Sequence, residues 1–368
     1  MKTVTWVTVS LLYISMMCGC TIVEETELVS YQYNDQERDV LVSIYYPQEQ
    51  IEALPLVVFS DGYFMSPDSY QSLLRNLVQN GYIVVAPHHH DYLAINTTGF
   101  GLFNVELPQF LSDIEQARDA LSQIEEYANI TNEEIIALFF NRAFSSSPHA
   151  AEVESLLSEN FSYRVREFEA ALEYALKRND DSQDTLYGRI DTTRVLALCH
   201  SFGGHTVLEK VSTTSASYDQ RIQAAVFMSP IHELGDATGV TIPTLWMTGT
   251  LDDTEFLNGT QRLFEQVVGP SYFLSLKKVG HVSFSSQLCS MVIGLSAIAA
   301  RLQVPDGTSE TNRAAAENYG EKGRAIADAT IMFFNAQLEQ TMSDPFADSF
   351  TQGYAFGYMV DAFEVSSD

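Results

Sequence analysis

The chain has 368 residues, of which 46% are hydrophobic and 11% aromatic, and these proportions are those of a folded globular protein. Its formal net charge at pH 7 is −28. So acidic a surface repels phosphate backbones and anionic lipid headgroups, which argues against a nucleic-acid-binding protein.

The first twenty residues, MKTVTWVTVSLLYISMMCGC, predict an export signal that precedes the folded domain. Lys2 supplies a positive start, and the apolar stretch 4–17 is too short to cross a bilayer comfortably. The ending MCGC resembles a bacterial lipoprotein signal, which implies that Cys20 is acylated and serves as the lipid anchor. An ordinary secretory signal is the alternative, because Met17 replaces the usual leucine. We therefore expect an exported protein, anchored to a bacterial membrane or else periplasmic or secreted.

Besides the anchor, the exported chain would keep two cysteines, Cys199 and Cys289. Two are too few for a disulfide framework, so we expect two buried free thiols, with a bridge between them as the alternative. No other segment has the length and apolarity of a membrane helix, and membrane contact is expected only through the anchor.

The segment after the signal predicts the start of a sheet. Residues 27–46 contain two β-rich runs around Asn34-Asp35, a pattern typical of a hairpin. PLVVFSDGY (55–63) and YIVVAP (82–87) are short apolar runs, as in strands that are buried on both faces of a parallel sheet. A helical pattern lies between them, so the order of strand, helix and strand indicates a doubly wound α/β fold.

Residues 106–178 have amphipathic helical patterns and little strand character, which predicts a helical cap insertion at about 100–160. No internal repeat or long linker is present, so 21–368 is expected to form a single domain that carries this insertion. After the insertion the sequence predicts strands at 194–199, 224–229, 244–249 and 272–279 and a helix at 313–340.

The stretch VLALCHSFGG predicts a nucleophile elbow. VLAL is a strand, Ser201 stands at the sharp turn after it, and Gly203-Gly204 allow the following helix to approach closely. Cys199 replaces the first glycine of the pattern G-x-S-x-G, but cysteine is also small. A glycine-rich turn from strand to helix with no catalytic role has the same local features and is the alternative.

Later strands supply a carboxylate and a histidine in the chain order that such hydrolases use, serine, then acid, then base. Asp252 and Asp253 follow one predicted strand, and His281 follows the next. The backbone N–H of Phe202 is the first expected oxyanion donor, and the loop in FSDGY is the expected source of the second.

CHSFGG, preceded by GRIDTTRV, resembles the GHSFGG of the platelet-activating-factor acetylhydrolase group and of dienelactone-hydrolase-like esterases. PLVVFSDGY, QNGYIVVAPHHHD and ATIMFF are similar too, and cutinase-like polyester hydrolases are nearby relatives. The resemblance covers roughly 55–91 and 185–340 and implies an α/β-hydrolase fold, with a mostly parallel central sheet flanked by helices. It also implies that Ser201 is the nucleophile, Asp252 the acid and His281 the base, with an oxyanion hole made by the amides of Tyr63 and Phe202.

Two residues depart from the pattern of that family. Cys199 stands where glycine is usual, and Asp61 stands where histidine commonly precedes the glycine. A carboxylate at Asp61, beside the oxyanion loop, is expected to disfavour anionic substrates. Asp253 is the alternative acid, although the spacing after Gly249 favours Asp252.

Another candidate is the run His88-His89-His90-Asp91. Its imidazole and carboxylate groups are ligands of the kinds that bind zinc. Consecutive residues on an extended segment point to opposite faces, so at most two of the four can converge, and no metal site is expected. His200 and His205 flank the elbow and are expected to be packing or hydrogen-bonded residues.

The sequence thus predicts an exported serine carboxylic ester hydrolase that works through an acyl-enzyme and needs no cofactor. The resemblance favours small or neutral esters, such as short-acyl lipids and phospholipids, with cutinase-like polyester or dienelactone-like hydrolysis as the alternatives. A binding lipoprotein that keeps a hydrolase fold without catalysis is the alternative from another class. A cysteine hydrolase acting through Cys199 fails on geometry, because the apex of the elbow is Ser201. The sequence leaves the oligomeric state open.

Overall fold

The computed structural model describes residues 21–49, 52–62, 65–90, 162–231, 235–252, 254–290, 292–293, 310–339 and 360–366. The predicted export signal with Cys20, the predicted cap insertion at about 100–160, and the site candidates Tyr63, Asp91 and Asp253 lie outside these residues. No helix within the described ranges has the length and apolarity that a bilayer crossing requires.

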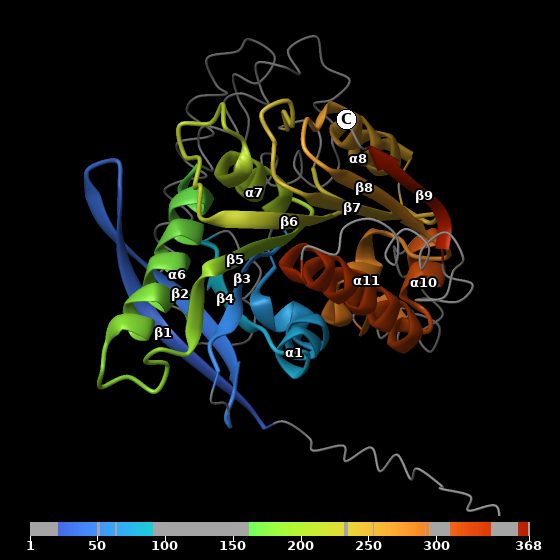
Figure 1. Cartoon of the computed structure of the whole chain (residues 1–368). Coiled ribbons are helices and arrows are strands. Elements are labelled where there is room, and N and C mark those ends of the chain that lie inside the picture. Colours follow the sequence, from blue (N-terminus) through green and yellow to red (C-terminus); the bar gives the residue numbers. More distant parts are fainter. Residues whose placement is uncertain are drawn as a thin grey trace, which may run out of the picture.

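The described strands form one sheet in the order β1-β2-β4-β3-β5-β6-β7-β8-β9 (Figure 1). Neighbours from β4 to β8 in this order pair in parallel, whereas β1–β2, β2–β4 and β8–β9 pair antiparallel. The mostly parallel sheet expected from the short apolar runs is thus confirmed. The strands are β1 (Ile22–Tyr33), β2 (Gln36–Pro47), β3 (Leu54–Ser60), β4 (Ile83–His88), β5 (Ile190–His200), β6 (Ile222–Met228), β7 (Thr244–Gly249), β8 (Ser271–Leu276) and β9 (Val360–Ser366).

The parallel strands are apolar on both faces because helices cover both sides of the sheet. Every residue of β4 and of β7 is buried. Successive side chains of β3 alternate between two core layers: Leu56 and Val58 pack on one side, and Val57 and Phe59 on the other. A continuous apolar run therefore predicts such a strand better than an alternating pattern does.

The helices form a layer on each face of the sheet (Figure 1). One layer consists of α6 (Tyr163–Asp180), α7 (Gly203–Val211) and α8 (Thr254–Gln266), and the other of α1 (Gln71–Gln79) and α11 (Tyr319–Glu339). The helix predicted at 313–340 is divided, since α10 (Glu310–Ala316) ends before α11 begins. Two short 3-10 turns, η1 (Pro67–Tyr70) and η5 (His281–Phe284), follow β3 and β8 in the chain.

The sheet topology brings together the loops that carry the predicted site residues. β3 lies between β4 and β5, so the chain leaves β3 toward one side and returns later on the other. Ligands of open α/β sheets bind outside the carboxyl ends of the strands at such a switch point. At the β1 edge of the sheet, β1 and β2 form the predicted hairpin, whose turn residues Asn34 and Asp35 both have positive φ.

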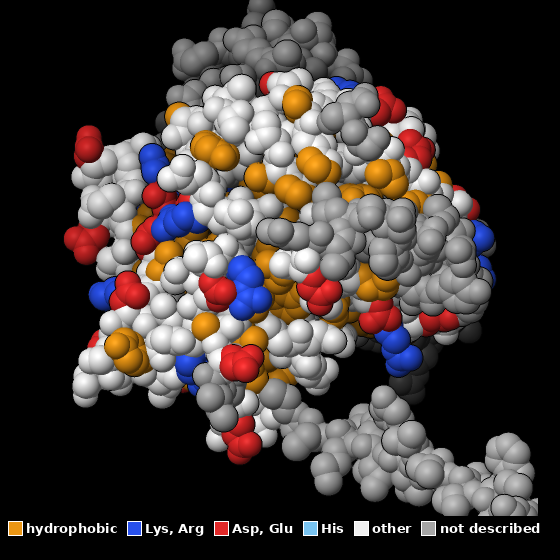
Figure 2. Space-filling view, viewed as in Figure 1, with side chains coloured by type: hydrophobic (Ala, Val, Ile, Leu, Met, Phe, Trp, Pro, Cys, Tyr) orange, Lys and Arg blue, Asp and Glu red, His pale blue; other side chains and the backbone are white. Residues whose placement is uncertain are grey.

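Charged side chains are dispersed over the visible surface. On the face shown in Figure 2, acidic and basic groups lie among polar and hydrophobic ones without forming one patch. Some acidic groups are paired, as in the contacts of Arg75 with Glu24 and of Arg221 with Asp219. The described charged groups on this face are therefore separate from one another.

Candidate active site

Ser201 lies at a strained turn between β5 and α7. β5 ends at His200, α7 begins at Gly203, and Ser201 has a φ of 53°. A positive φ is rare for a residue with a side chain. Backbone hydrogen bonds hold it here, because the N–H of Ser201 donates to the Met228 carbonyl (3.0 Å) and the N–H of Ile231 donates to the Ser201 carbonyl (2.9 Å). The structure therefore has the predicted elbow, with Ser201 at its apex.

The two glycines after the serine are required by close contacts. A Cβ added at Gly203 would lie 2.2 Å from the carbonyl oxygen of Ser60, at the end of β3. A Cβ added at Gly204 would lie 2.4 Å from the Cβ of Pro230. Any side chain at either position would push the start of α7 away from the sheet, so the glycines set the position of Ser201 relative to β3.

Cys199 takes the place of the first glycine without exposing its thiol. Its side chain is fully buried in the core, and its Sγ lies 3.4 Å from the Val226 carbonyl. Burial raises the pKa of the thiol well above its usual value, which keeps it protonated. Both Cys199 and Cys289 are free and buried, as expected. Cys199 therefore behaves as a packing residue.

The structure brings Ser201, His281 and Asp252 together at the carboxyl edge of the sheet. The Nε2 atom of His281 lies 2.9 Å from the Ser201 hydroxyl, within hydrogen-bond distance. The Nδ1 atom of His281 lies 3.5 Å from a carboxylate oxygen of Asp252, whose side chain is fully buried. This is somewhat longer than a hydrogen bond, and such contacts are often loose in proteins without substrate.

Two further residues hold this group, and the sequence reasoning missed both. The hydroxyl of Ser229, directly after β6, donates a short hydrogen bond to Asp252. Ser229 itself has a φ of 40°, so the turn after β6 is strained like the one after β5. The ring of Phe256 in α8 stacks on His281, with 4.1 Å between ring centroids. A serine at the end of the predicted strand 224–229 was a usable signal for the first contact, whereas the sequence gives none for the second.

Asp61 forms a buried ion pair with Arg164, the second residue of α6. The Nη2 atom of Arg164 lies 3.1 Å from the Asp61 carboxylate and donates to the Asp61 carbonyl at 2.5 Å. Neither side chain has any exposed surface. The charge of Asp61 is therefore compensated inside the protein, which corrects the expectation that it acts on anionic substrates.

Arg164 also contacts the other expected source of an oxyanion donor. Its guanidinium lies over the ring of Phe202, 5.2 Å from the ring centroid. Phe202 supplies the N–H directly after Ser201, and Asp61 lies two residues before Tyr63. One side chain thus touches both segments that were predicted to form the oxyanion hole. His205, on the first turn of α7, packs beside Phe202 and is nearly buried.

The histidines at the end of β4 form a hydrogen-bonded structural cluster with Glu167 of α6. His89 and His90 both contact the Glu167 carboxylate through their Nδ1 atoms, whereas His88 contacts the hydroxyl of Ser43 (2.8 Å). Burial by itself raises the pKa of Glu167, but its contacts with His90 and His89 outweigh burial and lower the pKa to about 2. Among the described residues, no three or more His, Cys, Asp or Glu side chains are arranged to hold a metal ion.

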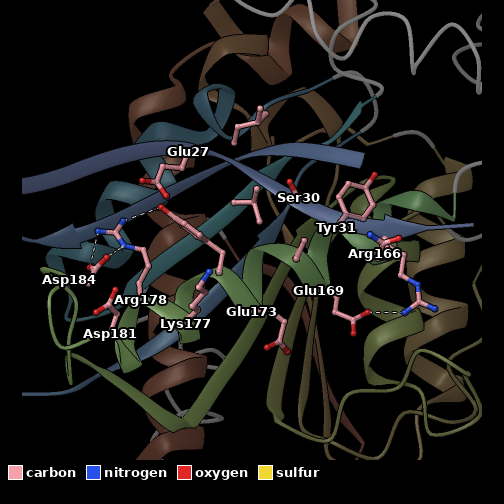
Figure 3. Close-up of a pocket in the computed structure, with 15 residues that line it drawn as sticks. Glu27, Ser30, Tyr31, Arg166, Glu169, Glu173, Lys177, Arg178, Asp181 and Asp184 are labelled. Carbon is pink, nitrogen blue, oxygen red and sulfur yellow. Dashed lines mark hydrogen bonds and ion pairs between the residues drawn. The ribbon is translucent and has the colours of Figure 1, made fainter. Parts of the chain in front are cut away.

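A groove of about 750 Å³ lies between β1 and α6 (Figure 3). Figure 3 shows charged side chains of both signs along it, among them Arg178, which is paired with Asp184. Its other polar residues come from β1, from α6 and from Asp181 directly after α6, and none of the described residues that line it belongs to the group around Ser201. The described lining of the groove therefore does not include the proposed nucleophile or base.

One curated protein is similar to part of this chain in sequence, and one solved structure is similar to it in fold. Cutinase est1 of Thermobifida alba is 27% identical over 139 residues, which are 37% of this chain and 44% of that protein. The chain thus matches less than half the length of this curated relative. A ferulic acid esterase from Streptomyces cinnamoneus is 16% identical and superposes with a TM-score of 0.57 over 94% of this chain and 96% of that one. At this identity the likeness shows the fold alone.

A family match covers more than half of the chain. The family described as platelet-activating factor acetylhydrolase, isoform II, matches residues 16–250. The matched range includes Ser201 and Asp61 and ends before Asp252 and His281. The match confirms the resemblance that CHSFGG carried, and the solved structure confirms the expected fold. The chain therefore belongs to the platelet-activating factor acetylhydrolase isoform II family, a group of ester hydrolases with the α/β-hydrolase fold.

Proposed function

We propose that the protein is an exported serine carboxylic ester hydrolase whose nucleophile is Ser201. The observation that carries the proposal is the 2.9 Å contact between the Ser201 hydroxyl and His281 Nε2, made by a serine at a strained elbow. A nucleophile and its base must lie within such a distance for a proton to pass between them. Asp252, behind the imidazole, completes the arrangement.

The reaction proceeds through an acyl-enzyme. The Ser201 oxygen attacks the ester carbonyl while His281 Nε2 takes its proton, and Asp252 stabilises the imidazolium that forms. The backbone N–H groups of Phe202 and Tyr63 stabilise the oxyanion of the tetrahedral intermediate. His281 then gives its proton to the leaving alcohol. Water, deprotonated by His281, then attacks the acyl-enzyme. The bond between the acyl carbon and the Ser201 oxygen breaks as His281 returns the proton to that oxygen, which releases the carboxylic acid and restores Ser201.

Small or neutral esters, such as short-acyl lipids and phospholipids, are the proposed substrates. The family description names an acetylhydrolase, which supports a short acyl group. Cutinase est1 supports polyester hydrolysis as the alternative, although the chain matches only 44% of that protein. The ferulic acid esterase shares the fold alone and adds an aromatic ester to the compounds worth testing.

A panel of p-nitrophenyl esters tests the proposed activity and acyl preference together. We expect kcat/KM to be highest for acetyl and butyryl esters and to fall as the acyl chain lengthens. A maximum at long acyl chains, or release of soluble products from a polyester film at a comparable rate, would favour the cutinase-like alternative. An absence of turnover together with a failure to react with a fluorophosphonate would favour the alternative of a non-catalytic binding lipoprotein.

Export and anchoring belong to the same proposal. The sequence that supports them is MKTVTWVTVSLLYISMMCGC, with Cys20 as the acylated residue and an ordinary secretory signal as the alternative. The proposed ester substrate is the only partner that the function requires, since neither cofactor nor metal takes part in the reaction described above.

A further inference from the structure

The Tyr70 hydroxyl lies between the oxyanion loop and the residue before the nucleophile. Tyr70 is the last residue of η1 and is fully buried. The backbone N–H of Gly62 donates to its hydroxyl oxygen at 3.2 Å. The same oxygen lies 2.7 Å from Nδ1 of His200, whose side chain is nearly buried. One hydroxyl therefore joins the loop after β3 to the end of β5.

Gly62 fits this junction closely. A Cβ added at Gly62 would lie 3.1 Å from the Tyr70 hydroxyl, 3.3 Å from His200 Nδ1 and 3.4 Å from the Cβ of Ser201. The loop backbone therefore packs directly against the hydroxyl, the imidazole and the nucleophile, and it has little room to shift. Tyr63, whose amide is a proposed oxyanion donor, is the next residue along this loop.

His200 also contacts the proposed base. Its ring centroid lies 4.7 Å from that of His281, and the ring of Phe284 packs against it at 5.3 Å. Burial lowers the pKa of His200 well below its usual value, and the proximity of His281 lowers it further. His200 therefore stays neutral beside an imidazole that becomes positively charged during the reaction.

The direction of the hydrogen bonds follows from these groups. A backbone N–H can only donate, so the Tyr70 oxygen accepts from Gly62. Its own hydrogen is then available to Nδ1, which accepts in a neutral histidine protonated at Nε2. The Gly62 N–H, the Tyr70 hydroxyl and Nδ1 of His200 are then all paired, whereas Nε2 of His200 has no hydrogen-bond partner among the described residues.

We propose that Tyr70 and His200 are positioning residues that hold the oxyanion loop and the ring of His281 in register with Ser201. The proposal rests on the ester hydrolysis proposed above. Tyr70 fixes the backbone of Gly62 by accepting its hydrogen bond. The ring of His200, which is hydrogen-bonded to Tyr70, packs against the ring of His281 and restrains it. A shift in either part would misalign the reacting groups, and a misplacement of about 1 Å can lower the rate of catalysis about 100-fold.

Tyr70→Phe tests the role of the hydroxyl with little loss of packing, since the ring that contacts Phe59 is kept. We expect kcat to fall on the order of 10- to 100-fold while KM stays nearly unchanged. Affinity for an alkyl trifluoromethyl ketone, which forms a tetrahedral oxyanion on the serine, should fall by a similar factor. A purely structural role would move neither of these readouts.

Two comparisons make the test specific. His200→Asn keeps an acceptor near the position of Nδ1 and should retain more of kcat than His200→Leu does. Tyr82→Phe is the matched control, because it also removes a hydroxyl of a nearly buried tyrosine, bonded to Asn335 at 2.6 Å. This control should change the melting temperature and leave kcat as in the wild type.

Wild-type kcat in a folded Tyr70→Phe variant, or equal loss in His200→Asn and His200→Leu, would overturn the positioning role and leave the proposed hydrolase intact. Failure of the wild-type protein to turn over esters and to react with a fluorophosphonate would overturn the proposed function itself. The two failures are therefore separated by the behaviour of the wild type.

Discussion

Arg164 and Asp61 form a fully buried ion pair across 103 residues of sequence, and the same guanidinium donates to the Asp61 backbone carbonyl. The first turn of α6 thereby holds the segment that leads into the oxyanion loop. Glu167, one turn further along α6, binds His89, which in turn contacts the hydroxyl of Ser60. Two buried charges of one helix thus fix the end of β3.

Arg164→Met should destabilise the protein strongly, because it leaves the Asp61 charge buried and uncompensated. The expected loss is about 3–5 kcal/mol in the free energy of unfolding, measured by urea denaturation. The double variant Arg164→Met/Asp61→Asn should recover part of this loss, since it removes the charge as well. Arg166→Met is the control on the same helix, because its pair with Glu169 is exposed and contributes about 1 kcal/mol or less. Similar losses for Arg164→Met and Arg166→Met would contradict the account.

The two adjacent aspartates should differ in their effect on catalysis. Asp252→Asn leaves His281 in the wrong tautomer and should lower kcat by about 10⁴-fold. Asp253→Asn should have a mild effect, and Ser229→Ala, which removes the hydroxyl that orients Asp252, should lie between them. Steady-state kinetics on an acetyl ester decides the order. If Asp253→Asn were the more damaging change, the acid would be Asp253.

Folding stability should decrease as the pH falls from 6.5 to 4. Burial, with a contribution from His89, lowers the pKa of His88 to about 4. Between these values the unfolded chain binds a proton at His88 that the folded protein does not, so each pH unit removes about 1.4 kcal/mol of stability. His200 adds to the loss with the same sign.

His88→Gln removes one of these protons and should make the slope of stability against pH shallower by up to about 1.4 kcal/mol per unit. Glu167 acts in a separate window, because its lowered pKa contributes stability above its ordinary value near 4.5 that is lost toward pH 2. Urea denaturation at intervals between pH 7 and 4 measures the slope. An unchanged slope in His88→Gln would show that His88 is not buried in its neutral form.

The buried strands and the elbow could be predicted because their signals are local. Short apolar runs predict strands covered on both faces, and CHSFGG places a serine between a strand and a helix. His281 could be placed because strand order in a parallel sheet brings successive loops to one edge. The roles of Arg164 and Tyr70 could not be predicted, since the partners of this buried charge and this buried hydroxyl lie far away in the sequence. The strand β9 was also missed, because its residues are only partly buried and give a weak pattern.

Replacement of the proposed anchor should separate localisation from catalysis. β1 runs parallel to β4, so its first residues lie at the edge of the sheet opposite to Ser201. Cys20→Ser should therefore move the protein from the membrane fraction to the soluble exported fraction with kcat unchanged. Activity measured in both fractions checks this. Retention in the membrane fraction would contradict lipid anchoring at Cys20.

The most direct test of the account is the reaction of Ser201 itself. Ser201→Ala should lower kcat for an acetyl ester by a factor on the order of 10⁴ to 10⁶ while the folded structure persists, as judged by circular dichroism. In the wild type, a fluorophosphonate should add one phosphonyl group, located on Ser201 by peptide mass spectrometry. A folded Ser201→Ala protein that keeps more than about a tenth of the wild-type kcat would contradict the assignment of the nucleophile.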